Sequence, residues 1–186
     1  MRARRARLAS GNAHKLEELR AALPGWGLEL LETAEPFPEE EGESYYENAR
    51  AKAEFGRRVA EPDVWMLGED SGIEVAALGG RPGIASARWA QDGVAQLLVE
   101  LRGVANRSAR YVCELVALSP DGEERRGSGV LEGTIAPEPR GEEGFGYDPI
   151  FVPAGEERTI AELGDTWKRA HSHRARAAAA LRAAVS

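Results

Sequence analysis

The sequence feature that most restricts the fold is a short apolar run that turns polar within one residue. Val64-Trp65-Met66-Leu67 has the length and apolar character of a strand buried in a sheet. Gly68-Glu69-Asp70-Ser71-Gly72 follows directly. We predict that the strand ends at Leu67 and that the polar residues lie at its carboxyl end, where ligands bind in open α/β sheets.

The adjacent carboxylates of Glu69 and Asp70 repel each other, so they need a shared positive charge. Mg²⁺ is the usual one, because it prefers oxygen ligands and keeps several waters. The alternative is a surface turn in which Asp70 and Ser71 cap a local bend.

The composition is that of a globular chain with one domain, or one domain with two lobes. Its 186 residues are 42% hydrophobic, enough for a core, and 30% charged. No apolar run has the length of a membrane span, and no signal-type apolar stretch follows the basic residues Met1–Arg7, which we take as the lead into a first strand ending at Leu8. The net charge of −7 disfavours general affinity for nucleic acid.

The single cysteine, Cys113, excludes an internal disulfide and fits a reducing cytoplasm. It lies in the apolar run Tyr111–Val116, which favours a packed thiol over a nucleophile.

The segment Ser10-Gly11-Asn12-Ala13-His14-Lys15 is a candidate phosphate site. It separates the first predicted strand from a helix in which Leu16, Leu19 and Leu23 recur at helical spacing. The free N–H groups and the dipole of a helix N-terminus attract anions, and Lys15 adds a positive charge. The alternative is an ordinary helix capped by Ser10 or Asn12, with Lys15 in solvent.

An acidic loop, residues 35–43, precedes a second predicted helix. Ser44 and Glu47 have capping-box spacing at its start, and Lys52 lies further along it. Such a charge run is usually a solvated surface, but it can also deliver one carboxylate to the metal of Glu69 and Asp70. Lys52 either is solvated or points into the site.

The remaining pattern predicts a mixed sheet and therefore an α/β fold. Leu28–Leu31 and Ile73–Val75 resemble strands, and Asp92 can cap a helix that ends near Leu101. Two strands, residues 110–118 and 125–131, flank a turn sequence and form an antiparallel hairpin.

Two C-terminal segments complete the set of motifs. Phe145-Gly146-Tyr147-Asp148-Pro149 presents aromatic faces that can stack on a nucleobase, or else forms a rigid aromatic-filled turn. Ser172-His173-Arg174 opens the closing helix, with Lys168 shortly before it. His173 and Arg174 either lie beside a bound anion or form an ordinary polar first turn.

In this order and at these separations, four segments resemble the inosine triphosphate pyrophosphatases, the Ham1 or RdgB-type family that acts on noncanonical purine nucleoside triphosphates. They are Ser10–Lys15, Asp70–Gly72, Phe145–Pro149 and Ser172–Arg174. The resemblance runs from Leu8 to the last helix. It departs at Glu69, where bacterial members often have a second aspartate.

The resemblance implies Mg²⁺-dependent hydrolysis of ITP, dITP and XTP to the monophosphate and pyrophosphate. It also implies a cytoplasmic homodimer whose chain, residues 1–186, is a single two-lobed domain. The implied fold is an elongated mixed β-sheet flanked by helices, with two lobes around a central cleft.

The resemblance also assigns roles to residues. Asp70 would be the general base, and the metal ligands would be Asp70, Glu69 and one acidic-loop glutamate, Glu39, which Glu40 or Glu41 could replace. The substrate-binding residues would be Ser10, Gly11, Asn12, Ala13, His14, Lys15, Lys52, Ser71, Phe145, Gly146, Tyr147, Asp148, Lys168, His173 and Arg174.

Two other functions stay open. One is a Maf-like pyrophosphatase acting on dTTP or modified pyrimidine nucleotides, which the Phe145 loop and the Ser172-His173-Arg174 segment disfavour. The other is a nucleotide-binding module without turnover, which the water-activating carboxylate of Asp70 disfavours.

Overall fold

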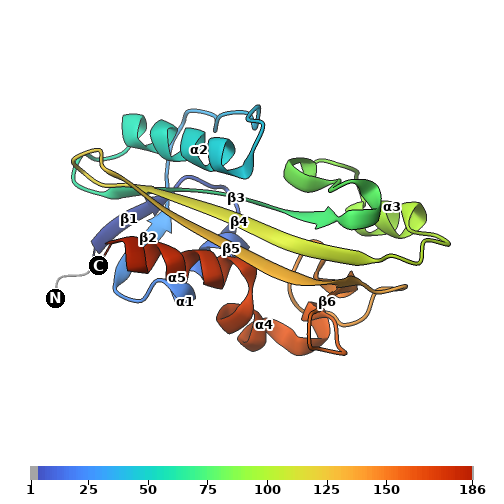
Figure 1. The fold of residues 1–186 in the computed structure, drawn as a ribbon. Helices are drawn as coiled ribbons and strands as arrows, with labels where there is room; N and C mark the ends of the chain where they lie inside the picture. Colours follow the sequence, from blue (N-terminus) through green and yellow to red (C-terminus); the bar gives the residue numbers. More distant parts are fainter. Residues whose placement is uncertain (1–3, 186) are drawn as a thin grey trace. The chain divides into compact units, whose positions relative to one another are not determined.

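The computed structural model describes residues 4–185 (Figure 1). Its strands are β1 (Arg4–Leu8), β2 (Trp26–Leu30), β3 (Trp65–Val75), β4 (Ser108–Leu118), β5 (Glu124–Ile135) and β6 (Phe151–Pro153). Its α-helices are α1 (Ala13–Ala22), α2 (Tyr45–Val59), α3 (Gly93–Glu100), α4 (Ile160–His171) and α5 (His173–Val185). Within these residues, no helix is both long and apolar enough to cross a membrane.

The strands form one mixed sheet in the order β2-β1-β3-β4-β5-β6. β1 pairs in parallel with both β2 and β3, whereas β5 and β6 are antiparallel. The turn Ser119–Glu123 joins the neighbouring strands β4 and β5, as the hairpin prediction required. The predicted mixed α/β sheet is therefore confirmed.

The chain divides into two compact units. Unit 1 contains residues 4–70, 113–129 and 174–185, and unit 2 contains residues 71–112 and 130–173. Strands β3, β4 and β5 each contribute residues to both units. The prediction of one two-lobed domain over residues 1–186 stays a prediction.

Unit 1 has an apolar cluster on each face of its strands. One cluster joins α1, α5 and the strands, with Leu67 and Leu115 among its members, and the other joins α2 to the opposite face, with Met66 and Val116. Adjacent residues of β3 and β4 thus face opposite sides, as the two-residue period of a strand requires. Figure 1 shows α2 on one side of these strands and α1 with α5 on the other.

Unit 2 has its own core of buried aliphatic and aromatic side chains. Ile73 and Val75 from β3 pack with Leu97 of α3, and Phe151 of β6 contacts the ring of Tyr111, with 4.7 Å between centroids. This unit therefore buries its apolar surface by itself.

The prediction that the strand ends at Leu67 is wrong, because β3 continues through Gly68-Glu69-Asp70-Ser71-Gly72 to Val75. The polar residues remain in the strand because each buried carboxylate finds polar partners on its own face of the sheet. The Ile73–Val75 strand, predicted separately, is the end of the same β3.

Gly68 allows α2 to approach β3 very closely. A Cβ atom at Gly68 would lie 1.8 Å from the carbonyl oxygen of Ala49 and 2.6 Å from the amide nitrogen of Ala53. Both atoms belong to the backbone of α2, so neither can move without the helix. The missing side chain therefore fixes the distance between α2 and the strand that carries Asp70.

We expect Gly68→Ala to lower the free energy of unfolding by about 1–3 kcal/mol or more, because the added methyl group must push α2 away from β3. Denaturant unfolding measures this change. Gly27→Ala in β2 is the matched control, since its Cβ would lie at an ordinary 3.6 Å from the carbonyl oxygen of Arg4. Equal stability losses in the two variants would contradict the prediction.

Candidate functional site

The loop before α1 is held by its own side chains. Asn12 caps the helix, with its Oδ1 accepting hydrogen bonds from the amides of His14 at 3.0 Å and Lys15 at 3.3 Å. Ser10 Oγ accepts from the amide of Asn12 at 3.1 Å. Because two of the first amides of α1 already have an acceptor, the positive charge offered here comes mainly from Lys15.

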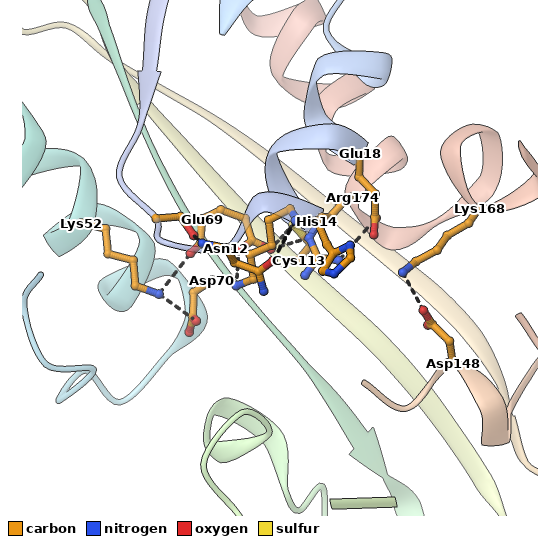
Figure 2. Close-up of polar contacts among 12 residues, drawn as sticks. Asn12, His14, Glu18, Lys52, Glu69, Asp70, Cys113, Asp148, Lys168 and Arg174 are labelled. Carbon is orange, nitrogen blue, oxygen red and sulfur yellow. Dashed lines mark hydrogen bonds and ion pairs between the residues drawn. The ribbon is translucent and has the colours of Figure 1, made fainter. Parts of the chain in front are cut away.

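Lys15 forms a buried ion pair with Glu69. Its Nζ lies 2.6 Å from Glu69 Oε2, and the Glu69 side chain has 0% exposure while that of Lys15 has 17%. Arg174, at the start of α5, donates from Nε to Glu69 Oε1 at 2.9 Å (Figure 2). Glu69 therefore joins α1, β3 and α5 within unit 1.

Two further residues contact this cluster, and the sequence analysis did not place either in the site. Glu18 Oε2 lies 3.4 Å from Arg174 Nη1, and the Cys113 thiol donates to Glu69 Oε1 at 3.5 Å. The sequence carried a signal for Glu18, which lies three residues after Lys15 and hence on the same face of α1. The packed thiol predicted for Cys113 is confirmed, since it is fully buried.

Burial and neighbouring charges act in opposite directions on Glu69. Burial alone would raise the pKa of this carboxyl group, but Lys15 and Arg174 hold the pKa well below its usual value. Glu69 is therefore ionised at neutral pH. Burial, followed by the charge of Glu69, raises the pKa of the Cys113 thiol, which stays protonated.

Asp70 points to the opposite face of β3, toward α2. Asn48 Nδ2 donates to Asp70 Oδ2 at 3.0 Å, and Lys52 Nζ lies 3.3 Å from Asp70 Oδ1. Lys52 also donates to the carbonyl oxygen of Glu69 at 3.1 Å and forms an ion pair with Glu40. The predicted alternative in which Lys52 points into the site is confirmed.

Burial raises the pKa of Asp70 to about 6, although Lys52 and Asn48 lower it in part. Burial alone would lower the pKa of Lys52, but Asp70 and Glu40 raise it above its ordinary value. Lys52 is thus a cation at neutral pH, and Asp70 exchanges its proton close to neutral pH. This behaviour suits a general base.

Asn48, which contacts Asp70, is a residue that sequence reasoning missed on this face. It is 2% exposed, and its Oδ1 accepts from the amide of Gly42 at 2.9 Å, so it ties the acidic loop to Asp70. The sequence contained a signal for Asn48, because it lies four residues before Lys52 and residues at this spacing share one face of a helix.

Two glutamates of the acidic loop, Glu39 and Glu40, differ in exposure and in their partners. Glu40 pairs with Lys52, whereas the Glu39 side chain is exposed and makes no hydrogen bond or ion pair with residues 4–185. Glu39 therefore stays a prediction as a metal ligand.

The expectation that Glu69 and Asp70 share one positive charge is wrong. They point to opposite faces of β3, where Glu69 faces Lys15 and Arg174, and Asp70 faces Lys52. Each carboxylate therefore has its own counter-ion.

The side chains around Lys52 offer oxygen donors on the Asp70 face. Among residues 4–185 there is no group of three or more His, Cys, Asp or Glu side chains arranged around a metal position. However, the Lys52 ammonium is surrounded by oxygens of Glu40, Asp70 and the Glu69 backbone. A cation already lies among oxygen donors here, which is the donor type that Mg²⁺ takes.

Unit 2 contains a second buried ion pair, between Asp148 and Lys168. Lys168 Nζ lies 2.6 Å from Asp148 Oδ2 and 3.9 Å from the centroid of the Phe145 ring. Asp148 also accepts from the amide of Phe145 at 2.8 Å and from the Tyr111 hydroxyl at 3.3 Å. Asp148 thus holds the Phe145 loop in shape.

The aromatic side chains of the Phe145–Pro149 segment differ in burial, and His173 stacks on another ring of unit 2. Tyr147 is buried, and its hydroxyl donates to the carbonyl oxygen of Ser86 at 2.9 Å, so it fastens the loop as the rigid-turn alternative predicted. His173 stacks on the Tyr111 ring with 4.5 Å between centroids and 4° between planes. Phe145 is only partly buried.

The predicted site residues divide between the units. Unit 1 contains Ser10, Gly11, Asn12, Ala13, His14, Lys15, Glu39, Lys52, Glu69, Asp70 and Arg174, and unit 2 contains Ser71, Phe145, Gly146, Tyr147, Asp148, Lys168 and His173. The chain passes from one unit to the other within two of the predicted motifs, at Asp70–Ser71 and at His173–Arg174.

Comparison with known proteins gives concordant matches in sequence and structure. The sequence model of the Ham1 family matches residues 6–184. A dITP/XTP pyrophosphatase of Deinococcus deserti is 44% identical over 99% of this chain and 90% of its own length. That of Bdellovibrio bacteriovorus is 42% identical over 91% of this chain and 92% of its own.

Solved structures agree. The Staphylococcus aureus Ham1 protein has a TM-score of 0.84 at 34% identity, with 97% of each chain covered. The nucleoside-triphosphatase or dITP/XTP pyrophosphatase of Mycobacterium abscessus has a TM-score of 0.72 at 40% identity, covering 95% of this chain and 97% of its own. Since the match extends over nearly the whole chain in both sequence and fold, this protein belongs to the Ham1 family.

Proposed function

We propose that this protein hydrolyses noncanonical purine nucleoside triphosphates, namely ITP, dITP and XTP, to the monophosphate and pyrophosphate. The observation that carries the proposal is Asp70, a buried carboxylate with a pKa near 6 beside the Lys52 cation. Relatives that are 42–44% identical over nine-tenths or more of the chain are dITP/XTP pyrophosphatases, which supports the same reaction here.

In the proposed reaction, Asp70 takes a proton from water as the water oxygen bonds to the α-phosphorus. The bond from that phosphorus to the bridging oxygen breaks, and pyrophosphate leaves with the electron pair. Lys15, Lys52 and Arg174 are the cations of unit 1 that we assign to the triphosphate charge. Positioning and charge neutralisation account for most catalysis in phosphoryl transfer.

Mg²⁺ is part of the proposal, with Asp70 and Glu39 as its carboxylate ligands. When bound, Mg²⁺ neutralises phosphate charge and makes a coordinated water more acidic. The oxygen surroundings of Lys52 support a cation on this face of β3. Glu69, predicted as a third ligand, is considered separately below.

Base recognition is assigned to unit 2. The 6-oxygen of hypoxanthine or xanthine accepts hydrogen bonds from a donor such as His173, whereas adenine presents an amino group there. The partly buried Phe145 ring offers a stacking face. Ser10–Lys15 and Ser71 are assigned to substrate contact. On the resemblance alone, the proposal extends to a cytoplasmic homodimer.

The substrate assignment predicts that pyrophosphate release with Mg²⁺ is far faster for ITP and XTP than for GTP, ATP and dTTP. For ATP the reason is that adenine would leave donors unpaired, which costs about 10⁴-fold or more in kcat/KM. Guanine keeps the 6-oxygen, so the expected preference over GTP rests on the dITP/XTP pyrophosphatase relatives alone. Pyrophosphate release from each nucleotide measures it. Preference for dTTP would support a Maf-like enzyme, and nucleotide binding without release would support a non-catalytic module.

We expect Asp70→Asn to reduce kcat by about 10³-fold or more while ITP still binds, because the general base is lost. In the wild type, the raised pKa means that Asp70 holds its proton until about pH 6. Activity should therefore be present above that pH and decline as the pH falls through about 6. Steady-state rates between pH 4.5 and about 8 measure the decline.

The control for that variant is Asp63→Asn, which removes a surface aspartate paired with Arg5. It should keep the wild-type rate and pH profile. A near-normal rate for Asp70→Asn would remove Asp70 from the role of base.

The metal assignment predicts that Glu39→Gln weakens Mn²⁺ binding about tenfold, because the metal loses a charged ligand. Titration of the nucleotide-free protein, followed by electron paramagnetic resonance, measures it. Glu35→Gln is the control, since Glu35 begins the same loop but pairs with Arg58. A loss confined to Glu40→Gln would transfer the ligand role to Glu40.

A further inference from the structure

We propose that Glu69 is a positioning residue that holds Lys15 and Arg174 for the triphosphate, and that it is not a metal ligand. The proposal deepens the proposed function and rests on it. It gives different roles to Glu69 and Asp70, two adjacent carboxylates that the sequence alone does not distinguish.

Both carboxylate oxygens of Glu69 already face a cation. Its Oε2 lies 2.6 Å from Lys15 Nζ, and its Oε1 accepts from Arg174 Nε at 2.9 Å and from the Cys113 thiol at 3.5 Å. The side chain has 0% exposure. To reach this fully buried carboxylate, a metal ion would have to displace the ammonium of Lys15 or the guanidinium of Arg174.

Charge balance separates the two faces of β3. On the Glu69 face, each carboxylate oxygen of Glu69 faces its own cation, Lys15 or Arg174. On the opposite face, the carboxylates of Asp70 and Glu40 both pair with the one ammonium of Lys52. Two carboxylates at one ammonium attract a divalent cation more than one carboxylate between two cations does.

The two cations depend on Glu69 to different degrees. Arg174 is also close to Glu18, but among residues 4–185 the ion pair with Glu69 is the only one that Lys15 makes. Loss of the Glu69 charge should therefore release Lys15 first. Without the Glu69 charge, the cations of Lys15 and Arg174 would keep only the carboxylate of Glu18 nearby, so we expect both side chains to move.

The test compares nucleotide binding and metal binding in Glu69→Gln. We expect the affinity for ITP in EDTA to fall about tenfold or more, because the cations that receive the phosphates are misplaced. We expect the Mn²⁺ affinity of the nucleotide-free protein to change less than about twofold, in contrast to Glu39→Gln. A tenfold loss of Mn²⁺ affinity, or unchanged ITP affinity, would overturn the proposal.

Glu69→Asp keeps the test informative if Glu69→Gln is unstable, and a double-mutant cycle with Lys15→Met adds a second test. Glu69→Asp keeps the charge and should restore most of the ITP affinity in EDTA. In the Lys15→Met background, adding Glu69→Gln should cost clearly less ITP affinity than it does in the wild type, because one of its two targets is gone. Equal costs in both backgrounds would overturn the proposal.

Cys113→Ala is the matched control, because it removes an uncharged contact to the same carboxylate. It should leave ITP affinity within about twofold, since no ion pair is lost. A loss as large as that of Glu69→Gln would mean that packing alone, and not the charge of Glu69, positions the cations, which overturns the proposal. Wild-type pyrophosphate release tests the proposed function separately, so the two failures are distinguishable.

Discussion

The arrangement of unit 1 depends on one constraint, the alternation of side chains along β3. Because adjacent residues of a strand face opposite sides of the sheet, Glu69 and Asp70 meet different helices and different cations. On one face, the buried Glu69 carboxylate lies between the cations of Lys15 and Arg174. The Asp70 face keeps a carboxylate that exchanges its proton near neutral pH. One strand thus provides both a fixed anchor and a reactive group.

Unit 2 uses a buried ion pair for another purpose. Asp148 accepts hydrogen bonds from Phe145 and Tyr111 while it pairs with Lys168, so a single carboxylate fixes the aromatic loop from three directions. In both units a buried carboxylate orients a lysine. Such pairs add little net stability, but each charge would be costly to leave alone.

The sequence was sufficient for the mixed α/β sheet and for the helices capped by Asn12, Ser44 and Asp92. It misplaced the end of β3, because a polar stretch after an apolar run normally marks the end of a strand. Continuation of β3 depends on partners from α1, α2 and α5, which no local pattern encodes. Asn48 and Glu18 were missed for the same reason, although helical spacing placed both beside recognised lysines.

The contact between β3 and α2 has a consequence for how this chain can evolve. At Gly68 the strand backbone and the backbone of α2 are too close for even one extra methyl group. A larger residue there is tolerated only if Ala49 and Ala53 move with their helix, which would carry Lys52 away from Asp70. Sequence change at position 68 is therefore coupled to the geometry around Asp70, and we expect homologues to change these three positions together or not at all.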